Sequence, residues 1–191
     1  MKKGILAGAI AATLLFASSV NAADYVIDKQ GAHASIQFKV SHLGYSFVVG
    51  RFNDFSGDFS FDKNAPTTSK VQVTINTASV DSNHQARDEH LRSGDFLNVE
   101  KFPKASFTST SVEDKGDGKL VLHGDFTFNG VTKPLAIDAK FIGEGQDPWG
   151  GYRAGFVGNT EFALKDFGID YDLGPSAANV HLDLVVEGVR Q

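Results

Sequence analysis

Cysteine is absent from this chain of 191 residues. The protein therefore holds no disulfide, no thiolate ligand for a metal ion and no cysteine to which a lipid could be attached. A chain of this length can bury enough apolar surface in one domain to be stable without such cross-links.

Basic residues are in the minority, since 18 Lys and Arg stand against 23 Asp and Glu and give a net charge of −5 with neutral histidines. Nucleic-acid affinity comes largely from cationic contacts to phosphate. Attraction to anionic lipid surfaces also needs basic clusters. We therefore expect no nucleic-acid partner and no charge-driven adhesion to anionic membranes.

Long apolar runs are also missing, apart from residues 5–16. This run is too short to span a bilayer comfortably, which takes about 20 residues. Two lysines precede it and small residues follow it, which is typical of a secretory signal peptide. We predict a signal peptide at 1–22, cleavage between Ala22 and Ala23, and a single periplasmic domain at 23–191 that is not membrane-embedded. An uncleaved N-terminal anchor is the alternative.

Alternating apolar and polar residues dominate the rest of the chain, as in half-buried β-strands. Phe55, Phe59 and Phe61, for example, share one parity with polar residues between them, and Asn129-Gly130 is a strong hairpin signal. About eight or nine such segments follow one another. The pattern predicts an all-β fold, a closed antiparallel β-barrel of about eight strands, with a β-sandwich as the alternative.

The segment Asp81–Leu97 breaks this alternation with a charged, helix-compatible sequence. We predict one short helix here that packs against the barrel or covers part of it. Ser82 or Asn83 would cap its start and Gly94 would end it. Three apolar residues would hold it in place: Leu91, Phe96 and Leu97.

Sixteen phenylalanines, all but Phe16 after the leader, could simply fill the barrel. A barrel of eight strands can also hold one small ligand, and alternation alone does not separate a solid interior from a hollow one. Gly57, Gly124 and Gly188 lie on the apolar parity of their segments. They either leave room for a guest or allow the strands to bend.

An inverted barrel, with the phenylalanines facing lipid and the polar residues facing a lumen, is a further alternative. The tyrosines and the single tryptophan do not form interfacial girdles, and the chain ends Arg190-Gln191 without an aromatic residue. These features favour the soluble arrangement.

Catalytic motifs are weak. His84, Asp88 and His90 lie close together in the expected helix but lack the H-E-x-x-H pattern of zinc hydrolases. No serine lies in a G-x-S-x-G turn. We expect an exposed helix in which Asp88 faces Arg87, Arg92 or His84, and we predict no enzyme activity, no bound metal and no cofactor. A metal-dependent hydrolase using the His84–His90 region is the alternative.

Several short motifs occur in a recognisable order: Tyr25-Val26-Ile27-Asp28, His33 with Phe38, His42-Leu43-Gly44, Phe52 with Asp54-Phe55-Ser56-Gly57, VQVTINTASVDSNHQARDEHLRSGDFL, Phe102 to Phe107, FNGVTKP and Asp147-Pro148-Trp149-Gly150. With these motifs the chain resembles the YceI-like polyisoprenoid-binding proteins of bacterial periplasms, from Asp24 to Val189. The resemblance implies a lipocalin-like barrel with an apolar tunnel for an isoprenoid chain, such as a polyprenyl lipid or a prenylated quinone precursor. It offers no catalytic residues.

The predicted function is therefore that of a periplasmic carrier whose ligand is an isoprenoid lipid or another lipophilic small molecule. A stress-related module with a solid core is the alternative from another class. Strand parity predicts that the lipid is contacted by Phe38, Val40, Phe59, Phe61, Val73, Ile75, Phe107, Leu122, Phe126, Phe128, Ile137, Phe156 and Leu184.

Overall fold

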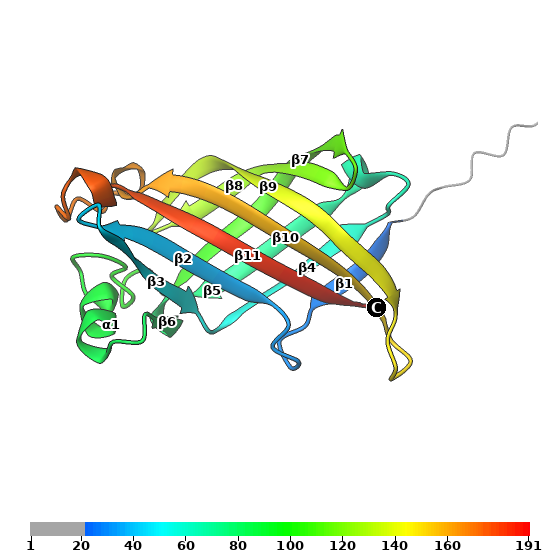
Figure 1. Cartoon of the computed structure of the whole chain (residues 1–191), viewed down its shortest axis with the longest axis horizontal. Helices are drawn as coiled ribbons and strands as arrows, with labels where there is room; N and C mark the ends of the chain where they lie inside the picture. The colour runs from blue at the N-terminus through cyan, green and yellow to red at the C-terminus, as the bar shows by residue number, and fades with distance from the viewer. Residues whose placement is uncertain (1–21) are drawn as a thin grey trace, which may run out of the picture.

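Eleven strands, one α-helix and four short 3-10 helices make up residues 22–191, the part of the chain that the computed structural model describes (Figure 1). The predicted signal peptide lies outside the described residues apart from Ala22. The strands are β1 Ala23–Ile27, β2 Ser35–His42, β3 Ser46–Phe52, β4 Phe55–Phe61, β5 Lys70–Asn76, β6 Val80–Asp81, β7 Lys104–Gly116, β8 Lys119–Phe128, β9 Val131–Gln146, β10 Tyr152–Ala163 and β11 Asn179–Arg190. The helices are α1 Gln85–Arg92, η1 Pro66–Thr68, η2 Thr77–Ser79, η3 Leu164–Phe167 and η4 Pro175–Ala177.

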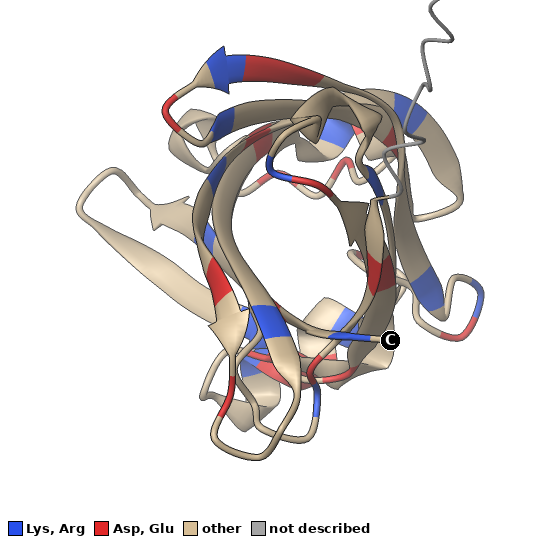
Figure 2. Ribbon diagram, turned by 90° about the vertical axis from the view of Figure 1, so that its right-hand side faces the viewer, with Lys and Arg blue, Asp and Glu red and all other residues tan. Residues whose placement is uncertain are grey.

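Eight of the strands close a barrel in the order β1-β4-β5-β7-β8-β9-β10-β11, with β1 paired again to β11. Every pairing is antiparallel, and the closing pair places Tyr25 opposite Arg190 and Ile27 opposite Gly188. The predicted closed antiparallel barrel of about eight strands is confirmed, and the sandwich alternative is wrong. Figure 2 views the ring along its axis, with charged residues of both signs around its wall.

The remaining three strands extend one end of the wall. β2 pairs with the first half of β11, from His181 to Val185, while β1 pairs with its last residues. β3 pairs with β2, and β6 adds only two residues beside β3. β1 and β2 therefore share one edge of β11, and the β2–β3 hairpin forms the wall at the end where α1 lies (Figure 1).

Phenylalanine fills much of the interior. Eleven of the fifteen phenylalanines in the described residues are buried, and Phe102, Phe141 and Phe156 are half-buried. Their rings pack at centroid distances of 4.9 to 5.8 Å, mostly tilted or edge to face. This is the arrangement that aromatic quadrupoles favour. Within the described residues the apolar parity of the barrel strands faces inward, as predicted.

The inward glycines are explained by these rings. A Cβ on Gly124 would lie 2.5 Å from the ring of Phe107, and one on Gly188 would lie 2.4 Å from the ring of Phe59. A Cβ on Gly57 would lie 2.4 Å from the carbonyl oxygen of Gln72. The interpretation that these glycines leave room for a guest is therefore wrong, because neighbouring side chains and backbone already take that space.

The predicted helix is present as α1, but its caps differ from those expected. His84 caps the start, its Nδ1 accepting a hydrogen bond from the backbone N–H of Arg87 at 3.2 Å. Ser82 is buried, and its hydroxyl donates to Asp88 Oδ1 and accepts a hydrogen bond from Arg87 Nε, so it is not free to cap the helix. Asn83 has a left-handed backbone, and the C-cap is Ser93 instead of Gly94.

No helix in residues 22–191 is both long and apolar enough to cross a bilayer.

Candidate functional site

A cavity of about 430 Å³ opens at the end of the barrel where α1 lies. This volume falls in the range of small-molecule sites, about 300–1,000 Å³. Its wall combines strand residues with α1 and the segments that flank it. The apolar residues of the wall are Ile36, Phe38, Val40, Leu43, Val48, Phe52, Ile75, Val80, Leu91, Phe96, Leu97, Ala105, Phe126, Phe128, Phe162, Leu164, Ile169, Tyr171, Leu173, Ala177, Val180 and Leu182. We call this space the outer cavity.

Polar groups are few in the outer cavity, and they come from two places. Arg87 and His90 are on α1, and Ser41 and His42 are at the end of β2. His90 Nε2 lies 2.9 Å from Asp95 Oδ2, and its ring packs on Phe96 and Tyr171. The side chains of His42 and His90 are exposed, so we place the mouth of the cavity between α1 and the β2–β3 turn.

A second cavity, of about 130 Å³, lies deeper in the barrel and is almost wholly apolar. We call it the inner cavity. Its wall residues include Phe55, Phe59, Phe61, Val71, Val112, Leu120, Leu135, Ala139 and Val186. An apolar cavity of about this size can take a small hydrocarbon.

The two cavities share four wall residues: Ile36, Ile75, Phe126 and Leu182. All four are buried, and Phe126 packs against Phe128, Phe162 and Phe167. We call these four residues the constriction. A chain that enters from the mouth must pass these four side chains to occupy both cavities.

All thirteen side chains predicted from strand parity lie on a cavity wall. Phe38, Val40 and Phe128 line the outer cavity, and Ile75 and Phe126 line both cavities. The other eight line the inner cavity: Phe59, Phe61, Val73, Phe107, Leu122, Ile137, Phe156 and Leu184. Their contact with a lipid stays a prediction.

The sequence missed much of the outer cavity. Val180 and Leu182 share a strand parity with Leu184, so alternation could have found them. Ile169, Tyr171 and Leu173 could not be found in this way, because they lie in the loop between β10 and β11, which has no periodic pattern. Leu91, Phe96 and Leu97 were expected only as anchors of the helix, yet they also form cavity wall.

The expected exposed position of Asp88 is wrong. Asp88 is buried and its Oδ1 accepts hydrogen bonds from the N–H and hydroxyl of Ser82. Arg87 donates Nε to the Ser82 hydroxyl at 2.7 Å, and Arg92 donates to the carbonyls of Ala78 and Val80. Asp88 holds the helix to Ser82, the residue that follows β6, and His84 and His90 have separate partners.

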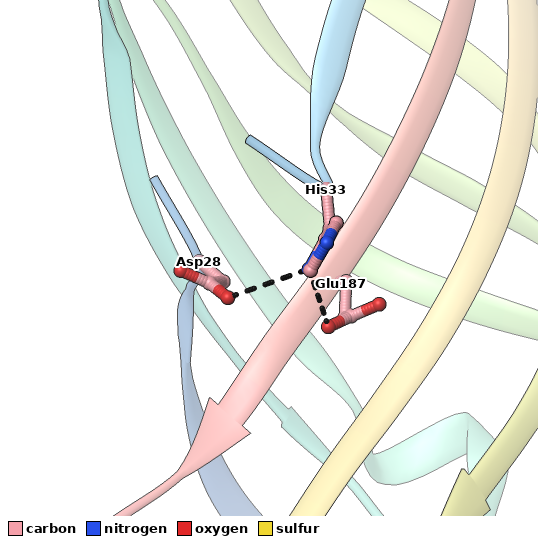
Figure 3. Close-up of side chains that lie close together, drawn as sticks. All are labelled: Asp28, His33 and Glu187. Atoms are coloured by element: carbon pink, nitrogen blue, oxygen red, sulfur yellow. Dashed lines mark ion pairs between the residues drawn. The ribbon is translucent and has the colours of Figure 1, made fainter. Parts of the chain in front are cut away.

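A different group lies close enough to hold a cation within residues 22–191: Asp28, His33 and Glu187, whose ligand atoms are within 4.8 Å of one another (Figure 3). His33 Nδ1 lies 3.3 Å from Glu187 Oε1 and 3.8 Å from Asp28 Oδ2. Arg153 Nη1, however, lies 2.6 Å from the same two carboxylate oxygens. A metal ion there would face a guanidinium charge, so the geometry favours an ion-pair network.

This Arg153 network joins the place where the barrel closes. Asp28 follows β1, Glu187 is on β11, and Arg153 on β10 also donates Nε to Asp147 at 2.7 Å. The pKa of Asp28 is held below its usual range by the N–H of Gly31 and by Arg153. Arg153 lowers the pKa of Asp147 in the same way, and the three carboxylates raise the pKa of the arginine.

Comparison with known proteins gives a consistent result. The sequence model of the YceI-like domain matches residues 25–188. A UPF0312 protein of Shewanella sp. strain MR-4 is 69% identical over the whole of both chains. The crystal structure of a Campylobacter jejuni YceI protein superposes with a TM-score of 0.72 at 31% identity, over 80% of this chain and 91% of that one.

A more distant structure has the same fold. A polyisoprenoid-binding domain from Saccharophagus degradans, implicated in plant cell wall breakdown, has a TM-score of 0.63 at 13% identity. The match covers 89% of this chain and 99% of that domain.

Proposed function

This chain belongs to the YceI-like domain family, and on that basis we propose that it binds and carries an isoprenoid lipid in the bacterial periplasm. The observation that carries the proposal is the pair of apolar cavities inside the barrel, which meet at the constriction. The polyisoprenoid-binding name of the Saccharophagus degradans domain, which has the same fold, supports the chemical class of the ligand.

The cavity walls suit a branched hydrocarbon. Burial of apolar surface contributes about 25 cal/mol per Å², and the inner cavity offers almost no polar partner that would favour another kind of ligand. A polar headgroup buried there without a hydrogen bond would cost several kcal/mol. We therefore place the prenyl tail inward and the headgroup at the mouth, near His42, Arg87 and His90.

The periplasmic location rests on the leader. The basic start, the apolar run at 5–16 and the small residues before Ala22 support export. The absence of cysteine is compatible with that compartment, since the fold does not depend on disulfides.

The test is native mass spectrometry of the protein purified from the compartment to which it is exported, followed by organic extraction of the bound material. We expect a mass adduct that dissociates on activation and an extract that contains a prenyl lipid. A protein that is free of adduct from every preparation, and that does not bind polyprenols added in detergent solution, would contradict the proposal and favour the module with a solid core.

The hydrolase alternative is separated by a second variant. Replacing His84 and His90 together by Gln would abolish a catalytic turnover, but polyprenol should still load, because the prenyl tail is held by apolar wall and neither histidine lies in the inner cavity. The separate hydrogen bonds of the two histidines favour the binding protein.

A further inference from the structure

The β2–β3 hairpin presents apolar side chains to solvent in a strand-like pattern. Leu43, Tyr45, Phe47 and Val49 lie at alternate positions and are 60%, 89%, 58% and 53% exposed. Lys, Arg, Asp and Glu are all missing from residues 40–50. Figure 2 shows this hairpin projecting from the barrel wall, at the left, without charge along its tip.

The core does not require these side chains. On the opposite parity of β3, Val48 lines the outer cavity, Phe52 is buried, and Gly50 accommodates the ring of Phe38. Phe47 is the one phenylalanine in the described residues that is exposed. Four large apolar side chains on a solvated face lower solubility, so this surface needs a partner that covers it.

The exposed surface continues into the cavity mouth. Leu43 belongs both to the hairpin tip and to the wall of the outer cavity. Tyr171 and Leu173, in the β10–β11 loop at the same end of the barrel, also line that cavity and are 45% and 37% exposed. An apolar path therefore runs from the outside of the hairpin into the binding site.

We propose that the tip of the β2–β3 hairpin, together with Tyr171 and Leu173, inserts into the surface of a lipid bilayer and opens the outer cavity onto the hydrocarbon. This inference rests on the proposed function and adds the partner from which the ligand is taken. A prenyl chain that crossed water would expose its apolar surface, at a free-energy cost of about 0.8 kcal/mol per CH₂. A mouth sealed against the bilayer avoids that cost.

A bilayer fits this surface better than a second copy of the chain does. A second copy would close the mouth, whereas a bilayer covers the same side chains and also supplies the ligand. Tyrosine and phenylalanine suit the membrane–water interface. Since the chain is acidic, binding should occur on zwitterionic vesicles and depend little on salt.

Fluorescence quenching can locate the contact, because the only tryptophan, Trp149, lies in the β9–β10 loop at the opposite end of the barrel (Figure 1). Phosphatidylcholine vesicles with brominated acyl chains quench a tryptophan that enters the bilayer. We expect no quenching of Trp149 in the wild type and strong quenching in the variant Tyr45→Trp/Trp149→Phe. Quenching of Trp149 alone, or of neither tryptophan, would overturn the proposal.

A transfer assay separates this inference from the proposed function. In the variant Tyr45→Ser/Phe47→Ser we expect polyprenol uptake from phosphatidylcholine vesicles to slow by about tenfold or more, because two rings lose their apolar burial. Equilibrium binding of the same polyprenol delivered in detergent should not change, since neither residue lines a cavity. The control Val26→Ser/Val185→Ser removes two exposed side chains elsewhere and should behave as the wild type.

The outcomes are distinguishable. Unchanged uptake from vesicles in the hairpin variant would overturn the inference and leave the proposed function intact. A wild-type protein that does not bind polyprenol even from detergent would overturn the proposed function. A dimer in sedimentation that is lost in the hairpin variant, without quenching by vesicles, would assign the surface to a second copy.

Discussion

At the scale of single residues, phenylalanine has two roles in this barrel. Phe126 and Phe128 line cavity wall, and Phe107 and Phe59 line the inner cavity while also covering the backbone at Gly124 and Gly188. A large ring beside a glycine keeps the wall closed where a second side chain would not fit. A Phe→Ala substitution at Phe107 or Phe59 should therefore uncover the backbone as well as remove cavity wall, whereas one at Phe128 should only remove cavity wall.

Phe126 and Asp125 offer a matched pair on β8, one pointing inward and one outward. Phe126→Asp buries a carboxylate at the constriction, so we expect the free energy of unfolding to fall by more than about 3 kcal/mol and ligand binding to be lost. Asp125→Asn should change stability by less than about 0.5 kcal/mol. Urea denaturation measures the stability of both variants, and native mass spectrometry measures their ligand binding.

Val40→Trp, which fills the outer cavity without a buried charge, should lose ligand while remaining folded.

The ion pairs of Arg153 with Asp28 and Asp147 should make the stability of the protein depend on pH. Because Asp28 and Asp147 have lowered pKa values in the folded protein, they stabilise it above the unfolded pKa of about 3.9. That contribution is lost as the pH falls through the lower folded values. We expect the Tm to fall between about pH 5 and pH 3. In Arg153→Gln the Tm should be lower at pH 7, and its difference from the wild type should shrink in acid. A constant difference over this range would contradict the assignment.

At the scale of elements, β11 organises the interior. It pairs with β10 along its whole length and with both β1 and β2 on its other edge. Its inward residues line the binding site in order of depth: Val180 lines the outer cavity, Leu182 both cavities and Leu184 the inner cavity. One strand therefore contributes wall residues to both cavities of the proposed tunnel.

This order gives a test of the constriction. Leu182→Ala and Leu184→Ala should each cost about 2–5 kcal/mol of stability, but only the first should join the cavities. We expect Leu182→Ala to raise the preference for a longer polyprenol over a shorter one by about tenfold, because each further CH₂ that is buried contributes about 0.8 kcal/mol. The ratio of dissociation constants measures this preference. An equal change in Leu184→Ala would mean that the constriction does not limit chain length.

At the scale of the whole molecule, the barrel and its inward face followed from alternation, because period 2 directly reports which side of a strand is buried. The caps of α1 did not follow, since Ser82 is held by Asp88, a contact that spacing alone does not reveal. Alternation also did not find Tyr171 and Leu173 at the mouth, because they lie in a loop whose position depends on tertiary packing. Sequence patterns thus located the wall of the proposed tunnel better than its entrance.

Removal of the ligand should affect the whole fold. A ligand that binds only the folded state, at about 100 times its Kd, adds about 2.7 kcal/mol. For a chain of this size that corresponds to roughly 5–10 °C in Tm. We therefore expect protein stripped with organic solvent and refolded to melt at a lower temperature, and polyprenol to restore the original value. Restoration by an unrelated detergent at the same concentration would argue against a specific site.

The pairing of β1 with β11 joins residues from the two ends of the described chain, and Gln191 donates its N–H to the carbonyl of Asp24 at 2.9 Å. The ring consequently stays open until β11 has paired with β1. Contacts so distant in sequence make folding slow. Until β11 docks between β1 and β10, the apolar inner wall is accessible to other unfolded copies, so aggregation should compete with this last pairing step, and a chaperone would act there.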